Sequence, residues 1–193
     1  ARQPTGVGAM RLFAAVEIPE SVKEQLLPLC AGLPGARWVT ADQMHVTLRF
    51  FGELDGALAE AVAEGLAAIR APTFSLSLSG IGHFGNGRRV RVLWAGLDPE
   101  PALEVLQGKV EQAARRGGLD LEGRKFHAHV TLARFKGGSP NLAGFLAHHE
   151  PFRSETFPVQ EFVLYSSHLS AAGAIYRREA RFPLADPASG AEA

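Results

Sequence analysis

The chain has one cysteine, no excess of either sign of charge and no long apolar run. Its single cysteine, Cys30, excludes an intrachain disulfide, and a buried, unreactive thiol is the simplest interpretation of its place after an apolar run. No stretch approaches the roughly 18–20 consecutive apolar residues that a membrane helix needs. The first residues lack the basic-then-apolar order of a signal peptide. We therefore expect a cytoplasmic protein that is not associated with a membrane.

Neither sign of charge is in excess, because Lys and Arg together number 20 and Asp and Glu also number 20. This balance argues against a general nucleic-acid coat, whose non-specific affinity comes from many phosphate contacts. It is compatible with a site that binds one phosphate or one end of a nucleic-acid strand. Sixteen of the basic residues are arginine, the better bidentate phosphate ligand, which is a weak indication in the same direction.

No strand-to-helix turn carries a Gly-rich phosphate loop, which argues against a doubly wound parallel fold and against ATP-driven chemistry. Periodicity and turn residues instead predict helices at about 19–29, 58–69, 101–116 and 141–149. The predicted strands are 11–18, 38–39, 45–51, 74–79, 90–94, 126–135, 157–169 and 175–182. Turns at 85–87 and 171–173 close hairpins, which require antiparallel neighbours.

This order of elements predicts an α+β fold of two pseudo-symmetric lobes, each an antiparallel sheet with outer helices, which face each other across a central cleft. Residues 10–185 are expected to form this single bilobal domain. Residues 1–9 are expected to be a disordered extension and residues 186–193 a disordered tail, since both are rich in small and polar residues. We expect the chain to act as a monomer.

The run His-Val-Thr-Leu occurs twice, at residues 45–48 and 129–132. Seven histidines and six threonines scattered at random in this chain would give roughly 0.2 His-x-Thr matches. The two copies begin 84 positions apart (129 − 45), a little under half of the chain. The spacing indicates two similar halves, each of which brings one histidine and one threonine to a shared site.

Strand geometry turns each run into a polar pair, because alternate side chains of a strand point to the same face. His45 and Thr47 therefore share one face, as do His129 and Thr131, while the valines and leucines pack behind them. A single His-Val-Thr-Leu run is more often part of an ordinary sheet face. Structure alone gives little reason to repeat the same polar pair in both halves, so the repeat favours a functional role. Two imidazoles can divide acid and base duties at one pH, and the hydroxyls can hydrogen-bond phosphate oxygens.

Other polar residues are weaker candidates for the functional site. Arg134 follows the second motif, and its guanidinium can either neutralise a phosphoryl group or form a salt bridge. His127 shares the expected face of His129, but two ligands without a nearby third are a weak zinc signal. The histidines at 148–149 lie in a polar helix end and are expected at the surface. We assign no role to His83 and His168.

The chain resembles the 2H phosphoesterase superfamily. The resemblance is carried by the paired motifs, the strand at 11–15, the run 48–52, the string 129–134 and the closing hairpin at 164–184. Within this superfamily, the chain is similar from residue 11 to about residue 184 to the bacterial RNA 2′,3′-cyclic phosphodiesterase family, historically called 2′–5′ RNA ligases. The resemblance implies a pseudo-twofold, two-lobed fold. It also implies an enzyme that opens RNA 2′,3′-cyclic phosphate ends to 2′-phosphates without a metal or other cofactor.

By the same resemblance, two histidines are catalytic and three further residues bind the substrate phosphate: His45 and His129, then Thr47, Thr131 and Arg134. Because the 3′ oxygen leaves, we expect His45 to be the proton donor that protonates it and His129 to be the proton acceptor that activates water. An aromatic residue, either Phe50 or Phe51, is expected to stack on the terminal base.

Three other functions stay open. The family also joins tRNA halves reversibly through 2′–5′ linkages, which differs from hydrolysis only in whether a hydroxyl end or water attacks. A non-catalytic RNA-end or nucleotide-binding module would bind a 2′-phosphate without turnover, although the intact motifs argue against it. A metallohydrolase would use His45, His127 and His129 as zinc ligands.

Overall fold

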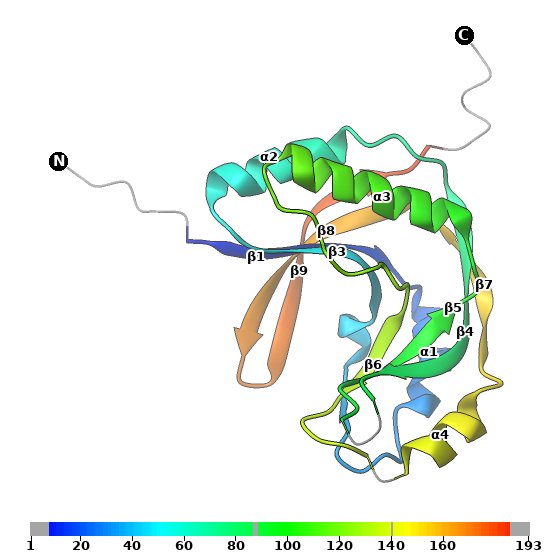
Figure 1. The fold of residues 1–193 in the computed structure, drawn as a ribbon. Coiled ribbons are helices and arrows are strands. Elements are labelled where there is room, and N and C mark those ends of the chain that lie inside the picture. The colour runs from blue at the N-terminus through cyan, green and yellow to red at the C-terminus, as the bar shows by residue number, and fades with distance from the viewer. Residues whose placement is uncertain (1–7, 87–88, 140, 186–193) are drawn as a thin grey trace.

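The two motif strands lie next to each other at the middle of an antiparallel sheet (Figure 1). The structure is a computed structural model that describes residues 8–86, 89–139 and 141–185. Its strands are β1 (Met10–Glu17), β2 (Arg37–Trp38), β3 (His45–Leu54), β4 (Phe74–Phe84), β5 (Val92–Leu97), β6 (Val130–Arg134), β7 (Arg153–Val159), β8 (Glu161–Ser170) and β9 (Gly173–Pro183). Its helices are α1 (Glu20–Leu26), α2 (Gly56–Ala67), α3 (Pro101–Arg116) and α4 (Leu142–His149), with 3₁₀ turns η1 (Leu27–Leu29) and η2 (Ala41–Gln43). The predicted α+β class is confirmed.

The sheet is nearly symmetric about its centre. The strand order is β7-β4-β5-β6-β3-β1-β8-β9, and the short β2 pairs with β6. Apart from β2, four strands therefore lie on each side of the boundary between β3 and β6, which corresponds to the two predicted lobes. Their sheets are joined at one pair, Val46 opposite Val130, so the lobes share a single hydrogen-bonded network.

The chain passes between the lobes more than once. Helices α2 and α3 pack on each other and contact β1 and β3 in one lobe, while α4 contacts β4 in the other (Figure 1). Helix α1 directly follows β1 in the sequence but packs against β7 of the opposite lobe. Each lobe is therefore assembled from both halves of the sequence, and neither lobe is one continuous segment.

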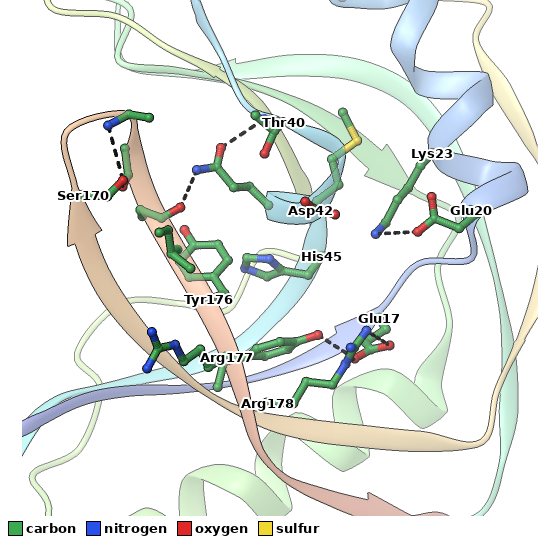
Figure 2. Close-up of a pocket in the computed structure, with 17 residues that line it drawn as sticks. Glu17, Glu20, Lys23, Thr40, Asp42, His45, Ser170, Tyr176, Arg177 and Arg178 are labelled. Carbon is green, nitrogen blue, oxygen red and sulfur yellow. Dashed lines mark hydrogen bonds and ion pairs between the residues drawn. The ribbon is translucent and has the colours of Figure 1, made fainter.

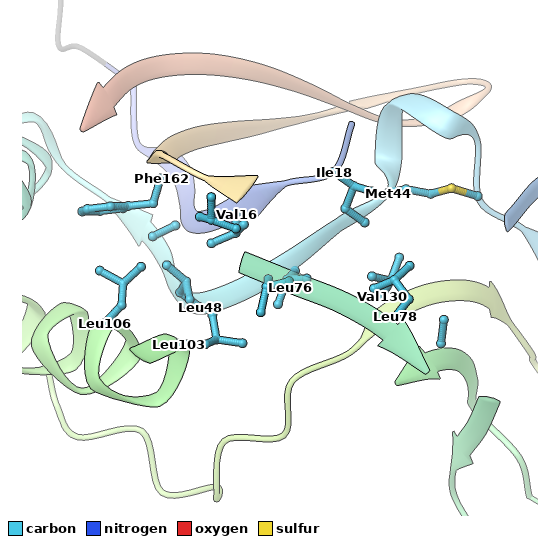
Figure 3. Packing of buried hydrophobic residues seen from close by; sticks show 14 of the residues in the cluster. Val16, Ile18, Met44, Leu48, Leu76, Leu78, Leu103, Leu106, Val130 and Phe162 are labelled. Atoms are coloured by element: carbon cyan, nitrogen blue, oxygen red, sulfur yellow. The ribbon is translucent and has the colours of Figure 1, made fainter. Parts of the chain in front are cut away.

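The apolar partners of the two motifs lie in the core. Val46, Val130 and Leu132 are fully buried, and Leu48 is nearly so. Figure 3 shows Leu48 close to Leu103 of α3, which covers this face of the sheet. The predicted alternation is confirmed within each motif, and the polar members of the motifs must therefore face the other way.

Both motif strands contain a β-bulge directly after the motif threonine. In β3, Thr47 and Arg49 lie opposite consecutive residues of β1, which leaves Leu48 as the extra residue. In β6, Leu132 is left out of the pairing with β5 in the same way. A bulge changes the parity of the strand, because two residues oppose one. Residues beyond each bulge therefore face opposite to what simple alternation predicts.

Several predicted boundaries are wrong. β3 continues through Gly52, the predicted stop, because this glycine adopts a positive φ of 81° and is accommodated as a second irregularity of the pairing with β1. β6 begins at Val130, so residues 126–129 lie outside it. β7 was not predicted, and its last residues, 157–159, were merged with the next strand. The predicted loop 41–44 contains η2, whose Thr40–Gln43 capping box stabilises the turn.

Some predictions fall outside the described residues. These are residues 1–7 of the expected extension, all of the expected tail at 186–193, and Gly87 of the first expected hairpin turn. Residues 8 and 9 are exposed and belong to neither a helix nor a strand. In the part of the chain that the structure describes, no helix is long and apolar enough to cross a membrane.

Candidate active site

The five residues predicted for the site all line one cleft where the lobes meet. The cleft has a volume of about 580 Å³. Strands β3 and β6 contribute the motif residues, and the β8–β9 hairpin supplies another wall through Leu169 and residues 172–174. The structure thus brings together side chains that are far apart in the sequence: His45, Thr47, His129, Thr131 and Arg134.

His45 begins β3 and is held from several sides. Its Nε2 lies 3.0 Å from Oγ1 of Thr47, and the ring also forms a hydrogen bond with the backbone of Gln43. The ring centroids of Phe13 and Tyr176 lie 5.0 and 5.4 Å from that of the imidazole. Figure 2 shows Tyr176 directly beside His45. The aromatic surroundings limit the access of water to this imidazole.

His129 lies just before β6 and is anchored in a similar way. Its Nδ1 lies 2.7 Å from the carbonyl oxygen of His127. A carbonyl only accepts, so Nδ1 donates and Nε2 is the unprotonated nitrogen of the neutral ring. Phe84 packs edge-on against the imidazole at 4.8 Å between centroids. Both predicted catalytic rings are therefore oriented by the backbone two residues before them.

Burial lowers the pKa of both imidazoles. The pKa of His45 falls to about 4, first because the ring is removed from water and further because His129 and Arg134 add positive charge, while the hydrogen bond to Gln43 acts in the opposite direction. Burial also lowers the pKa of His129, with smaller contributions from His127 and Arg134. Both rings are thus neutral at pH 7. An anionic phosphate would favour the charged form of either ring.

The two motifs differ in the residue that stands five positions after each histidine. Phe50 in β3 and Arg134 in β6 occupy equivalent places beyond the two bulges, and both line the cleft. Phe50 is 57% exposed, whereas its neighbour Phe51 is buried in the core. The cleft therefore has an apolar side from β3 and a cationic side from β6, and of the two adjacent phenylalanines Phe50 is the one that lines it.

The remaining candidates take other positions. His127 is exposed and packs against Trp94, with 4.8 Å between ring centroids. Within the described residues no group of three or more His, Cys, Asp or Glu side chains is placed to hold a metal ion, so this part offers no ligand set for the zinc alternative. His148 is exposed on α4, as predicted. Burial raises the pKa of the partly buried Cys30 thiol to about 11, which keeps it unreactive near neutral pH.

Sequence reasoning missed the residues that attach the β8–β9 hairpin to the site. Gln43 donates a hydrogen bond from Nε2 to the carbonyl oxygen of Ala174 at 2.8 Å. Its Oε1 accepts from the backbone N–H of Thr40 at 3.0 Å. The first contact joins segments 131 positions apart, so no local pattern predicts it. The capping box was visible as Thr-x-x-Gln but predicts only a turn.

A second cavity of about 630 Å³ shares His45, Gln43 and Tyr176 with the cleft (Figure 2). Beside it, Glu17 accepts a hydrogen bond from the Tyr165 hydroxyl at 2.6 Å and forms an ion pair with Arg178. Burial and the neighbouring carboxylate raise the pKa of Tyr165, which keeps its hydroxyl a donor. This network ties β1, β8 and β9 together behind His45.

Comparison with known protein families explains the repeat. The family model described as LigT like Phosphoesterase matches residues 16–94 and, a second time, residues 96–176. Each match contains one His-Val-Thr-Leu run. The predicted division of the chain into two similar halves is confirmed.

Individual relatives resemble nearly the whole chain. A protein of Archaeoglobus fulgidus named RNA 2′,3′-cyclic phosphodiesterase is 31% identical over 174 residues, which cover 87% of this chain and 97% of that protein. A protein of the same name from Escherichia coli strain K12 is 31% identical over 182 residues, which cover 90% of this chain and 96% of that protein. The crystal structure of Escherichia coli LigT in apo form has a TM-score of 0.74 at 28% identity, over 93% of this chain and 99% of that one.

Proposed function

The chain belongs to the LigT-like phosphoesterase family, and from this we propose that it hydrolyses 2′,3′-cyclic phosphate ends of RNA to 2′-phosphates. One observation carries the proposal: two imidazoles, two threonine hydroxyls and one guanidinium from two equivalent strands line the same cleft. Relatives that bear the name of this activity support the choice of substrate.

His129 acts as the general base in the proposed mechanism. Its Nδ1 is held by a backbone carbonyl, so Nε2 is free to take a proton from water. The lowered pKa of this ring keeps it neutral at pH 7, which a base requires. As the proton passes to Nε2, the water oxygen bonds to phosphorus and the phosphorus–O3′ bond breaks.

His45 acts as the general acid. It donates its proton to the departing 3′ oxygen, so the products are a 3′-hydroxyl and a 2′-phosphate. Burial lowers the pKa of His45 to about 4, which is too low for the ring to be charged at pH 7. Binding of the anionic cyclic phosphate opposes this effect, because a nearby negative charge favours the protonated imidazole. Substrate thus helps to supply the acid that its own cleavage needs.

Threonine and arginine side chains hold the phosphoryl group. We assign Thr47 and Thr131 to the non-bridging oxygens and Arg134 to the negative charge that grows as water adds. In this mechanism the guanidinium and the protonated imidazole perform the charge neutralisation, so no metal ion is needed. Phe50, exposed at the apolar side of the cleft, offers a surface on which the terminal base can stack.

The test is turnover of an RNA oligonucleotide with a 2′,3′-cyclic phosphate end in the presence of EDTA. We expect activity from the unaltered chain and a loss of roughly 100- to 10,000-fold in kcat for His45→Ala and for His129→Ala. The double variant should be no worse than either single one, because the two rings act as a unit. His148→Ala, an exposed histidine on α4, is the matched control and should keep full activity.

Product analysis separates the proposal from its competitors. A 2′-phosphate product supports it, whereas a 3′-phosphate product would show that the 2′ oxygen leaves and contradict the assigned mechanism. Joined RNA ends would identify ligation. Binding of a 2′-phosphate nucleotide without any turnover would identify a binding module, and activity that EDTA abolishes and zinc restores would identify a metallohydrolase.

A further inference from the structure

The cleft is strongly cationic although the chain as a whole is neutral. Three arginines line it, and none of the described residues that line it is an aspartate or a glutamate. The complete chain has 20 acidic and 20 basic residues. If charged residues were distributed at random, the cleft would contain acids as well as bases. Positive charge is therefore concentrated in the cleft, and it comes from Arg37, Arg124 and Arg134.

Two of these arginines stand directly opposite each other. Arg37 in β2 pairs with Arg134 in β6, and both side chains line the cleft. Like charges at opposed positions of neighbouring strands repel each other. Among the described residues neither arginine forms an ion pair with a carboxylate. The repulsion is therefore uncompensated within the described part of the chain, and an anion in the cleft would relieve it.

The third arginine is carried by an anchored loop. The Arg124 side chain is 90% exposed and forms an ion pair with Glu122 of the same loop, at 3.6 Å between Nε and Oε1. The loop is attached to the protein because Glu122 donates its backbone N–H to the carboxylate of Glu111 in α3, and the carbonyl oxygen of Asp120 accepts from Arg49. Arg124 thus lines the cleft from a loop that is hydrogen-bonded to the rest of the protein.

The three guanidinium groups exceed what one phosphate needs. Arg134 lines the cleft together with both imidazoles, and its charge contributes to the lowered pKa of each. Arg37 belongs to the next strand, which is spaced by about 4.8 Å in a sheet. Arg124 approaches from the segment before His129. Two cations besides Arg134 in the same cleft match a ligand that brings more than one phosphate, as a single strand does.

We propose that Arg37 and Arg124 bind the phosphates that precede the cyclic end, so that the cleft selects the end of an RNA strand over a cyclic mononucleotide. This inference rests on the proposed function and adds a second phosphate subsite to it. Arg37 is the principal ligand, since its planar guanidinium can bind a phosphate through two hydrogen bonds. Arg124 lines the same cleft and contributes a further cation.

The experiment compares two substrates with the same terminal base: a 2′,3′-cyclic mononucleotide and a trinucleotide that ends in the same cyclic phosphate. Arg37→Ala should lower kcat/KM for the trinucleotide roughly three- to tenfold and leave the mononucleotide unchanged. Adding Arg124→Ala should deepen the loss for the trinucleotide only. Arg134→Ala should impair both substrates equally, and Arg116→Ala, an exposed arginine at the end of α3, should impair neither.

Salt dependence provides a second readout. Each lost phosphate contact should make the plot of log kcat/KM against log salt shallower by roughly 0.7 for the trinucleotide. Arg37→Lys should keep most of this slope but lose part of the affinity, since it retains the charge without the bidentate geometry. Thermal unfolding of Arg37→Ala should not be earlier than that of the unaltered chain, because the substitution removes a repulsion.

Equal losses on both substrates would overturn the inference, because Arg37 would then serve the reacting phosphate. Unchanged kinetics on both would also overturn it. Failure of the proposed function is distinguishable, since neither substrate would be turned over by the unaltered chain. In that case the affinities for a mononucleotide and a trinucleotide that end in a 2′-phosphate, measured by calorimetry, decide the question. Tighter binding of the trinucleotide that is lost in Arg37→Ala supports the subsite, and equal binding refutes it.

Discussion

At the scale of single residues, the two histidines are oriented by the same kind of hydrogen bond but differ in the side chains that surround them. Each ring is oriented through the backbone two residues before it. His45 is packed among Phe13, Tyr165 and Tyr176, whereas His129 meets Phe84 at an edge. The aromatic neighbours exclude water and lower the pKa of each ring below 6.5. The pH dependence of catalysis follows from these shifts.

We predict a bell-shaped pH profile of kcat/KM that lies on the acid side of about 6.5. The active form of the pair holds one proton. At low pH both rings are charged and the acceptor is lost, while at high pH both are neutral and the donor is lost. Because both pKa values are lowered, and that of His45 to about 4, kcat/KM should decrease as the pH rises beyond 6.5.

The profile is measured with substrate well below KM for kcat/KM and at saturation for kcat. The kcat profile should be displaced to higher pH, because the bound phosphate raises the pKa of each ring. Arg134→Ala, which removes a positive charge near both rings, should move the falling limb of kcat/KM upward in pH. A rate that is constant or increasing above pH 6.5 would contradict the assignment of the pair.

Phe50 and Phe51 are adjacent but should respond differently to substitution. Phe51 is 8% exposed within the core, so Phe51→Ala should lower the free energy of unfolding by about 3–5 kcal/mol. Phe50 is exposed in the cleft, so Phe50→Ala should change stability by about 0.5 kcal/mol or less. If Phe50 stacks on the terminal base, its loss should cost about 1–3 kcal/mol of substrate binding.

Chemical denaturation and KM measured on both variants check this pair of predictions. Phe50→Tyr keeps an aromatic face and is the conservative control, expected to retain most of the binding. An unchanged KM in Phe50→Ala would exclude stacking at this position.

At the scale of elements, the β-bulges decide which side chains reach the cleft. By simple alternation from His45, Arg49 and Phe51 would share the face of the histidine. The bulge at Leu48 reverses this, so Arg49 turns inward to form an ion pair with Glu111 of α3. The equivalent bulge in β6 turns Arg134 toward the cleft. Alternation predicted each motif correctly because the bulge residue is the last residue of the motif, so the side chains before it keep simple alternation.

The sequence therefore predicted which motif side chains share one face better than it predicted their surroundings. Period-two polarity and an exact repeat identified the histidines and threonines, which depend only on local strand geometry. Phe50 could not be chosen over Phe51, because a bulge is set by the pairing of β3 with β1 and leaves no mark in one strand alone. The Gln43–Ala174 contact joins segments 131 positions apart and was equally invisible.

The β8–β9 hairpin is a wall of the cleft that depends on Gln43. Its Nε2 donates to the carbonyl of Ala174, and its Oε1 accepts from Thr40. We predict that Gln43→Glu breaks only the contact with the hairpin, because a carboxylate can accept from Thr40 but cannot donate to Ala174. Loss of this hydrogen bond should lower the local stability of the hairpin by about 1–2 kcal/mol. It should also lower kcat/KM.

Hydrogen exchange of the backbone amides at 172–176 measures this local stability directly. Those amides should exchange faster in Gln43→Glu, while the amides of α3 stay unchanged. Asp42→Ala in the same 3₁₀ turn is the control, since Asp42 is exposed and makes no contact with the hairpin among the described hydrogen bonds. Exchange that is equally fast in both variants would show that the turn itself, and not the Gln43 contact, holds the hairpin.

At the scale of the whole molecule, two similar sequence halves do not fold into two separate lobes. The family model matches residues 16–94 and 96–176, yet α1 and β4 of the first match belong to the lobe that also holds β6 and β7. The two lobes are further joined by the Val46–Val130 pair at the centre of the sheet. Each lobe requires chain from both halves, which leaves little opportunity for one lobe to unfold alone.

We predict a single cooperative unfolding transition, and two spectroscopic probes report on different lobes. Both tryptophans, Trp38 in β2 and Trp94 in β5, belong to the lobe of β4–β7, so fluorescence follows that lobe. The longest helices, α2 and α3, pack on the other lobe and dominate the far-ultraviolet dichroism. In urea the two signals should change together, with one midpoint.

Val130→Ala, which leaves a cavity where the lobes join, should lower that midpoint for both probes equally. If fluorescence changed at lower urea than dichroism, the lobes would be separate units and the central pair would not couple them.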